Sequence, residues 1–277
     1  MFKAILKGSF QLCLSNFDTL IKAAGTWTVI LIVGGLAKYV LWVAGQPHAD
    51  GSMMRPALDA YNILSWLMPL LGIVAASSIA VAWHRFALLG ETPATFHVRF
   101  GKSEFRYTLY NQLFLLCVYA ISSAIFFLFL RLVAILTDGG NLESTAAFAR
   151  LGIALILSFL FMVPIWARVS LMLPAAAVDE PMGPLRAYRF AKGMGWAMTF
   201  ANLCLVFPLI LLAWIIRGIE KIIGSGSPQA FGEILTLLVI GLEWIIPAIL
   251  ALSVSTVAYA LARRRHEATA EPIDPAA

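Results

Sequence analysis

Charged side chains are scarce in this chain of 277 residues, and only 13% of its residues are Asp, Glu, Lys or Arg. In a typical soluble domain about a quarter of the residues are charged. Apolar residues fill the difference and make up 61% of the sequence. This balance excludes an ordinary soluble domain and indicates that lipid surrounds most of the chain.

Cysteine and histidine are also rare. The cysteines are far apart, at Cys13, Cys117 and Cys204, and no CxxC motif or Cys/His cluster occurs. The four histidines are equally scattered, at His48, His84, His97 and His266, and His84 is predicted to be an interfacial residue. These spacings exclude the usual zinc sites and a disulfide framework. We therefore predict no bound metal and no cofactor.

Signatures of catalysis are missing as well. The sequence contains no HExxH, GxSxG or Walker A motif, and no GxGxxG between a strand and a helix. An intramembrane enzyme would need catalytic groups clustered at one depth, and the sequence offers no such cluster. We therefore expect a protein without enzymatic activity.

Long apolar runs are what the sequence has in abundance, and several approach or exceed the roughly 20 residues that cross a bilayer as a helix. They predict an all-α membrane bundle of six transmembrane helices in one domain, residues 1–262. The predicted spans are residues 26–44, 61–84, 104–137, 147–178, 197–216 and 234–262. Ser103 is predicted to cap the third span, and Pro164 and Pro174 to bend the fourth. Residues 263–277 are polar and predict a disordered cytoplasmic tail.

A basic segment precedes each pair of spans. Residues 2–22 place apolar side chains at helical spacing, with Lys3 and Lys7 off the apolar stripe, which predicts a helix in the membrane interface. Similar basic segments occupy residues 96–107 and 183–195. The pattern predicts three repeated hairpins, each preceded by a basic amphipathic segment, rather than an inverted-repeat transporter.

The distribution of Lys and Arg predicts an orientation. Fourteen of these residues fall on the side of the predicted bundle that holds both termini, and six fall on the other side. The positive-inside rule then places both termini in the cytoplasm. Because the cations adjoin apolar runs, we expect them to bind anionic lipid on the cytoplasmic side and not nucleic acid.

Two arginines at the ends of spans are candidate functional residues. Arg85 follows Trp83-His84, and Arg168 follows Trp166-Ala167. Both are predicted to contact lipid phosphates, with further attraction from Arg186, Arg189 and Lys192. The alternative is that Arg85 and Arg168 cap their own helices and pair with nearby acids, which include Glu91, Glu104, Asp179 and Glu180.

Glu243 is a third candidate because an ionisable side chain inside a span is costly. It lies four residues before Pro247, which frees the backbone carbonyl of residue 243. A polar cavity around Glu243 would suit a transporter of small solutes or lipids. The alternative is a structural ion pair with Arg150 or Arg131.

The same motifs resemble those of a known family. The similar residues are Trp83-His84-Arg85 with Leu88–Glu91, Arg99-Phe100-Gly101 with Glu104, Arg168 with Pro174-Ala175 and Val178-Asp179, and Ala187-Tyr188-Arg189 with Gly193. They resemble uncharacterised six-span inner-membrane proteins of bacteria, related to the membrane domain associated with glycerophosphodiester phosphodiesterases. The resemblance implies a six-span helical domain in the inner membrane of a bacterium. It implies no phosphodiesterase activity, because that chemistry belongs to a separate soluble barrel.

These observations favour a non-enzymatic membrane protein that organises lipid or scaffolds a partner in the cell envelope. A small-solute or lipid transporter that uses Glu243 is the alternative. The two differ in what they require around Glu243, since only the transporter needs a polar cavity there.

Overall fold

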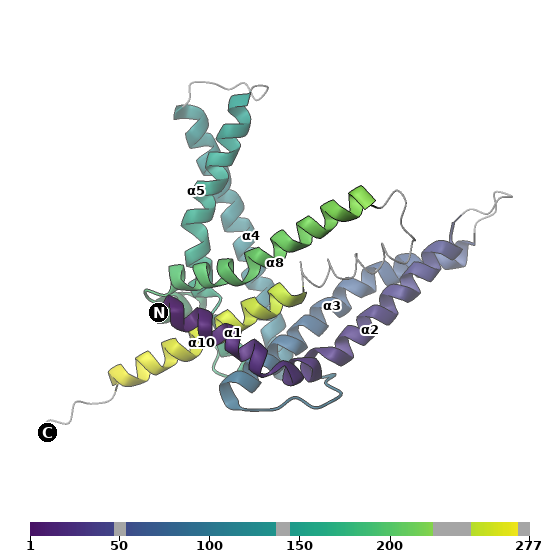
Figure 1. Ribbon diagram of the computed structural model, residues 1–277, viewed down its shortest axis with the longest axis horizontal. Coiled ribbons are helices and arrows are strands. Elements are labelled where there is room, and N and C mark those ends of the chain that lie inside the picture. Colours follow the sequence, from purple (N-terminus) through teal and green to yellow (C-terminus); the bar gives the residue numbers. More distant parts are fainter. Residues whose placement is uncertain (47–53, 137–144, 224–244, 271–277) are drawn as a thin grey trace, which may run out of the picture. The chain divides into compact units, whose positions relative to one another are not determined.

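Every element of the computed structural model is a helix within the residues it describes, which are 1–46, 54–136, 145–223 and 245–270. Figure 1 shows the helices α1 (Phe2–Ser15), α2 (Phe17–Ala44), α3 (Arg55–Leu89), α4 (Lys102–Leu136), α5 (Thr145–Val169), α6 (Met172–Ala177), α7 (Pro184–Phe190), α8 (Gly195–Ile223) and α10 (Ile246–Ala270). The predicted all-α class is confirmed.

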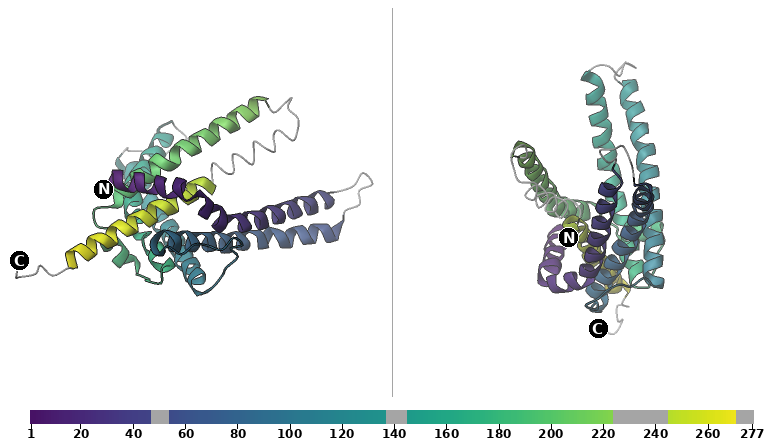
Figure 2. Two further views of the ribbon diagram at one scale, coloured as in Figure 1. Left: turned by 60° about the horizontal axis from the view of Figure 1, so that its bottom comes forward. Right: turned by 90° about the vertical axis from the view of Figure 1, so that its right-hand side faces the viewer.

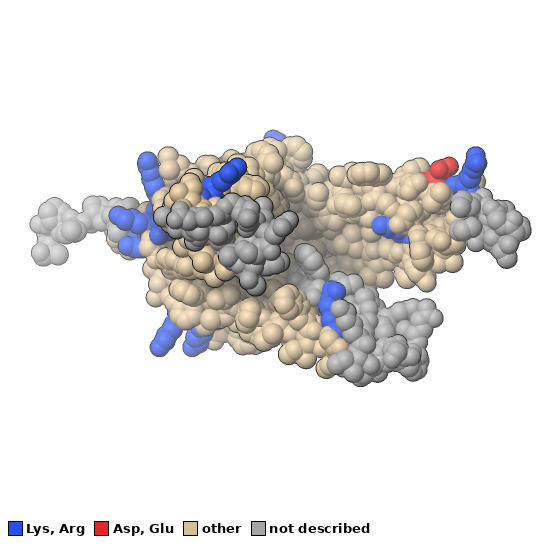
Figure 3. Space-filling view, turned by 90° about the horizontal axis from the view of Figure 1, so that it is seen from above, with Lys and Arg blue, Asp and Glu red and all other residues tan. Residues whose placement is uncertain are grey.

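Six of the described helical segments are long and apolar enough to cross a membrane. They are Phe17–Ala44, Arg55–Leu89, Lys102–Ile135, Leu151–Ala177, Gly195–Ile219 and Ile246–Ala268. Their outward faces carry large apolar side chains, among them Trp66, Leu116 and Trp214, which are 79%, 64% and 67% exposed. Most of the surface seen in Figure 3 is uncharged. Side chains of this kind are stable on the outside only when lipid covers them, and the six-span prediction is confirmed.

Two compact units divide the chain where the sequence predicts one domain. We call residues 15–109 and 176–180 the hairpin unit, and residues 1–14, 110–175 and 181–277 the bundle unit. The short segment 176–180 belongs to the hairpin unit although its flanking residues belong to the bundle unit. Contacts between residues distant in the sequence decide this division, and no local composition signal marks it.

The hairpin unit is built on α2 and α3, which lie side by side in the views of Figures 1 and 2. Gly34 allows close approach, because a Cβ there would lie 2.6 Å from the Sδ atom of Met68. Helix α3 continues through Pro69 and ends before Gly90, whose φ of 74° is the left-handed conformation that glycine adopts freely.

The bundle unit packs α8 against both α5 and α10, and α7 against α5. The indole N–H of Trp166 on α5 donates to the hydroxyl of Ser122 on α4 over 3.1 Å. Helix α1 buries Ile5, Ser9 and Cys13, which are four residues apart and therefore share one face. Helix α1, which carries Lys3 and Lys7, thus uses part of its surface for contacts inside the protein.

Several boundaries differ from the predicted ones because tertiary contacts decide where helices end. The interfacial helix predicted over 2–22 ends at Ser15, and residues 17–22 begin α2. The long fourth span continues through Pro164 and breaks after Val169, before α6. The basic segment 183–195 forms only the short helix Pro184–Phe190, and residues 96–101 are not helical.

The chain beyond residue 262 is helical as far as Ala270, so the prediction of disorder from residue 263 is wrong for residues 263–270. The Nε atom of Arg263 lies 3.0 Å from a carboxylate oxygen of Glu267 one turn later, which supports the helix. Arg265 and His266 contact residues that follow or end α7. Residues 271–277 lie outside the described part of the chain.

Candidate functional site

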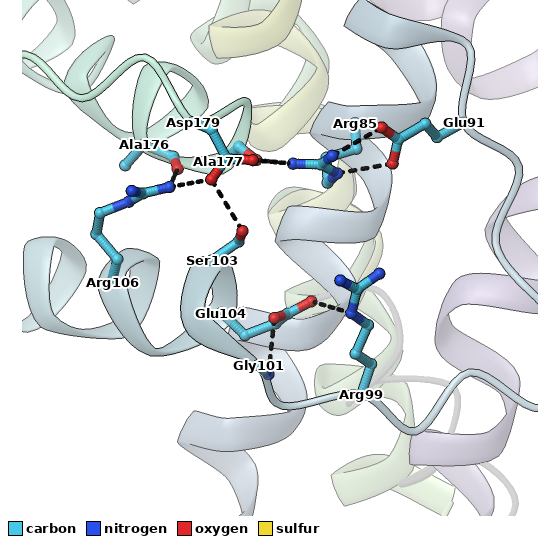
Figure 4. A network of polar contacts seen from close by, with 10 residues as sticks. All are labelled: Arg85, Glu91, Arg99, Gly101, Ser103, Glu104, Arg106, Ala176, Ala177 and Asp179. Atoms are coloured by element: carbon cyan, nitrogen blue, oxygen red, sulfur yellow. Dashed lines mark hydrogen bonds and ion pairs between the residues drawn. The ribbon is translucent and has the colours of Figure 1, made fainter.

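Arg85 is the centre of a network of polar contacts in the hairpin unit (Figure 4). Its guanidinium donates twice to the carboxylate of Glu91, with both donor–acceptor distances 2.7 Å. Its Nη1 atom also donates to Asp179 over 2.6 Å and to the carbonyl oxygen of Ala177 over 3.1 Å. Because two carboxylates and a carbonyl already occupy this guanidinium, its main partners are groups of the protein itself.

Asp179 joins three parts of the hairpin unit. Its carboxylate accepts hydrogen bonds from Arg85 on α3 and from Ser103 and Arg106 on α4, and the Ser103 distance is 3.0 Å. Arg106 also donates to the carbonyl oxygen of Ala176 over 3.1 Å. The hydrogen bond from Arg85 is the largest cause that holds the pKa of Asp179 below its ordinary value, against a smaller opposing effect of burial.

Glu91 has the same electrostatic character. The hydrogen bonds from Arg85 hold the pKa of Glu91 below its ordinary value, although the side chain is largely exposed. The carboxylates of Glu91 and Asp179 are therefore ionised at neutral pH and balance the charges of Arg85 and Arg106. This arrangement is what the capping-and-pairing alternative expects of Arg85, and a contact between Arg85 and lipid phosphate stays a prediction.

Glu104 caps the start of α4. It is only 2% exposed, and its carboxylate accepts a hydrogen bond from the backbone N–H of Gly101 over 2.8 Å. Arg99 places its Nε atom 3.5 Å from the same carboxylate. Gly101 thus occupies the N-cap position and Glu104 the third helical position, which is one half of a capping box. The prediction that Ser103 is the N-cap is wrong, because its hydroxyl donates to Asp179 instead.

Arg168 lies in a different setting in the bundle unit, near the end of α5. Its guanidinium carbon is 4.9 Å from the centre of the Tyr188 ring, which is a cation–π contact. Its Nε atom is buried and has no hydrogen-bond partner in the described structure. No ion pair to Arg168 is formed by the described residues.

Arg186, Arg189 and Lys192 are exposed on and just after α7, and they form no ion pair with any described residue. The end of α10 lies beside them. His266 stacks on the ring of Phe190 with centroids 4.7 Å apart, and Arg265 donates to the carbonyl oxygen of Lys192 over 3.3 Å.

Helix α1 brings further cations to this end of α10. A Cβ at Gly8 would touch Val257, and the thiol of Cys13 is 2.9 Å from the hydroxyl of Ser253. Residue numbers rise along α1 as they fall along α10, so the start of α1 lies toward the basic end of α10. We define the cationic cluster as Lys3, Lys7, Arg186, Arg189, Lys192, Arg264 and Arg265.

The two units differ in their balance of charge, since the bundle unit has 13 Lys and Arg and 8 Asp and Glu, whereas the hairpin unit has 7 of each. Of the acids whose side chains the structure describes, Glu267 alone belongs to the bundle unit, and it pairs with Arg263. The hairpin unit contains Asp18, Asp59, Glu91, Glu104, Asp179 and Glu180. The sequence predicted one group of headgroup-binding cations, and the structure divides that group in two. Arg85 is paired with acids of the hairpin unit. The other members form no ion pair with any described acid, and they are Arg168, Arg186, Arg189 and Lys192.

The intramembrane site predicted around Glu243 lies outside the described residues, as does the side chain of Arg150. Arg131 lies on α4 and is exposed. The polar cavity therefore stays a prediction. Among the described residues, no group of three or more His, Cys, Asp and Glu side chains is arranged to hold a metal ion.

Sequence reasoning missed two partners in these networks. Ser103 and Arg106 are three residues apart on α4, a spacing that places both on one helix face toward Asp179. His84, predicted to be interfacial, is fully buried with its ring centroid 5.8 Å from that of Tyr107. The helical spacing of Ser103 and Arg106 was a usable signal, whereas nothing local marked the burial of His84.

The fold and the exposed apolar helices define a helical, multi-pass integral membrane protein. Comparison of the chain with protein-family models, curated proteins and solved structures finds no match. The resemblance to the phosphodiesterase-associated membrane proteins therefore stays a prediction carried by its sequence motifs.

Proposed function

We propose that this protein is a non-enzymatic component of a bacterial inner membrane that gathers anionic phospholipids on the cytoplasmic side. The cationic cluster of the bundle unit supplies the attraction. The observation that carries this proposal is the excess of positive charge in that unit, which has 13 Lys and Arg against 8 Asp and Glu, while the hairpin unit has 7 of each. The binding of lipid would serve to organise the surrounding membrane or to hold an envelope partner.

The physical basis is electrostatic. Each Lys or Arg close to an anionic membrane surface contributes about 1 kcal/mol, and the attraction falls off within about 10 Å at moderate salt. Several such cations on one end of a membrane-embedded unit enrich anionic lipids locally, and exchange between bound and bulk lipid remains possible. This mode of action needs no cavity and no reacting groups.

The location follows from the same charges. Basic segments near span ends remain on the cytoplasmic side during insertion, and the cytoplasmic leaflet carries the anionic lipids. The cationic cluster lies close to the N-terminus and to the last described turns of α10. Both termini are therefore proposed to be cytoplasmic.

Lipid enrichment around the full-length protein tests the proposal. The protein is placed in nanodiscs of phosphatidylcholine with a minor fraction of phosphatidylglycerol, and co-isolated lipids are quantified by mass spectrometry. We expect phosphatidylglycerol to be enriched around the wild type. We expect most of that enrichment to be lost in the triple variant Arg186→Gln, Arg189→Gln, Lys192→Gln, because each substitution removes about 1 kcal/mol of attraction.

A matched variant controls for net charge. Lys22, Arg55 and Lys102 are exposed cations of the hairpin unit, and their replacement by Gln removes the same charge. We expect this control to keep the enrichment. Equal loss in both triple variants, or no enrichment in the wild type, would contradict the proposal.

A further inference from the structure

Arg168 differs from the cationic cluster in how it is held. The side chains of the cluster are exposed, whereas Arg168 is only partly accessible and its Nε atom is buried. Its guanidinium carbon lies over the ring of Tyr188, 4.9 Å from the ring centroid. A side chain with this much contact has given up most of its rotamer freedom, so its position is defined before any ligand arrives.

Gly195, the first residue of α8, makes this packing possible. A Cβ at residue 195 would lie 2.8 Å from the Nε atom of Arg168 and would also overlap the carbonyl oxygen of Pro164. The absence of a side chain thus lets α8 approach α5 at the level of Arg168. Three elements, α5, α7 and α8, together fix one arginine.

Among the described residues, no acid pairs with Arg168 and no acceptor lies within hydrogen-bond distance of its buried Nε–H. A buried donor without an acceptor is unfavourable, and such defects concentrate at functional sites. Arg85 follows Trp83-His84 as Arg168 follows Trp166-Ala167. The guanidinium of Arg85, in contrast, forms ion pairs with Glu91 and Asp179.

We propose that Arg168, backed by Tyr188, binds one phosphate group. A guanidinium presents paired donors that match two oxygens of a phosphate, and the aromatic ring keeps its plane in place. The phosphate belongs to a lipid headgroup or to a free phosphate anion, since both offer the same oxygens. This site rests on the proposed lipid-binding function, because the cationic cluster of the same unit concentrates anions near it. The cluster attracts any anion by charge, whereas Arg168 would recognise the phosphate group itself.

Binding to the full-length protein in a maltoside detergent, which contains no phosphate, tests the site. Native mass spectrometry counts bound phosphatidic acid, and an anionic fatty acid with a carboxylate head serves as the comparison. Phosphorus NMR measures the binding of inorganic phosphate in the same detergent. We expect one phosphatidic acid to be retained per chain and the carboxylate lipid to bind more weakly.

Conservative variants identify the residue responsible. Arg168→Lys keeps the charge but loses the paired donors, and we expect about a tenfold loss of phosphate affinity. Arg55→Lys makes the same change at an exposed position of the hairpin unit and should change the affinity by less than about twofold. Tyr188→Phe keeps the aromatic ring and should retain phosphate binding. Tyr188→Leu removes the ring and should weaken phosphate binding, although Arg168 itself is unchanged.

The outcomes separate the possible sources of phosphate. Binding of phosphatidic acid alone indicates a lipid site, and binding of inorganic phosphate as well indicates that the free anion suffices. Equal effects of Arg168→Lys and Arg55→Lys, or equal binding of the carboxylate lipid, would overturn the proposal. If Arg168→Lys does not fold, as judged by gel filtration, the two Tyr188 variants decide the question, and unchanged affinity in Tyr188→Leu overturns it.

Failure here is distinguishable from failure of the proposed function. The triple variant of Arg186, Arg189 and Lys192 leaves Arg168 in place. Retention of one phosphatidic acid by that variant, with no enrichment of phosphatidylglycerol around the wild type, would support the Arg168 site and reject the wider function. The opposite result is enrichment of phosphatidylglycerol that Arg168→Lys leaves unchanged, with no stoichiometric binding of phosphate. That result would support the wider function and reject the Arg168 site.

Discussion

Asp179 has a φ of 63°, a left-handed backbone conformation that residues other than glycine adopt infrequently. Asp and Asn are the best tolerated of the larger residues there, since their short polar side chains form local hydrogen bonds. The carboxylate of Asp179 at the same time accepts from Arg85, Ser103 and Arg106. One residue thus combines an unusual backbone conformation with the contacts that bring segment 176–180 into the hairpin unit.

The ionisation of Asp179 predicts a dependence of stability on acid. Its pKa is held below 3.8, chiefly by the hydrogen bond from Arg85, so the folded state favours the charged form. The contribution to stability is full above the unfolded pKa and is lost as pH falls through the lower, folded pKa. We expect the melting temperature in detergent to fall as the pH is lowered below about 4.

Asp179→Asn tests this contribution because asparagine keeps the left-handed conformation and removes the charge. We expect a loss of about 1 kcal/mol at neutral pH, since half of the side chain is exposed and solvent screens its ion pairs. The variant should also lose less stability in acid than the wild type. Asp59→Asn, at an exposed position outside the network, is the control. An acid profile for Asp179→Asn that matches the wild type would contradict this role.

Helices in this protein could largely be predicted, but their ends could not. The sequence places the six spans because apolar runs of sufficient length are a local property. The start of α4 depends on Glu104 reaching back to Gly101, and the break at Asn16 falls within a continuous helical pattern. The helical residues 263–270 are held in part by contacts of Arg265 and His266 with the chain around α7, which no local pattern reveals.

Two glycines of α8 provide a test of helix packing. A Cβ at Gly195 would overlap Pro164 and crowd Arg168, whereas a Cβ at Gly218 meets nothing within 4 Å. We expect Gly195→Ala to destabilise the protein by about 1–3 kcal/mol because the helices must move apart. Gly218→Ala should be neutral or stabilise by about 0.5–1 kcal/mol because alanine favours the helix. Thermal unfolding of the two variants in detergent measures both effects, and equal stabilities would show that α8 does not approach α5 closely.

At the scale of the whole molecule, the two units differ in their charge. The acids of the hairpin unit are used in contacts such as those of Asp179 and Glu91, while the bundle unit carries mainly cations among its described charges. The two roles predicted for the arginines at span ends, pairing with acids and contact with lipid phosphate, therefore belong to different residues. Arg85 belongs to a structural network, and Arg168 and the cationic cluster carry the proposed interaction with lipid.

The proposed orientation is testable on intact cells. Reporter fusions after residue 95 and at the C-terminus should both be active in the cytoplasm, because the positive-inside rule retains the basic segments there. A fusion after residue 225 should report the opposite side. Alkaline phosphatase and green fluorescent protein, which are active on opposite sides of a bacterial inner membrane, give complementary readings. Opposite locations for residue 95 and the C-terminus would contradict a six-span arrangement with both ends inside.

The amino-acid sequence by itself determined the class of protein, the number of spans and the residues that merit attention. These depend on the hydropathy and spacing of neighbouring residues, and both can be read along the chain. Only the tertiary structure decided that Arg85 is neutralised by Glu91 and Asp179, while Arg168 lies over the ring of Tyr188 and pairs with no acid in the described part of the chain. The two arginines stand in similar sequence motifs, and the difference arises because folding brings carboxylates from distant segments to one of them and an aromatic ring to the other.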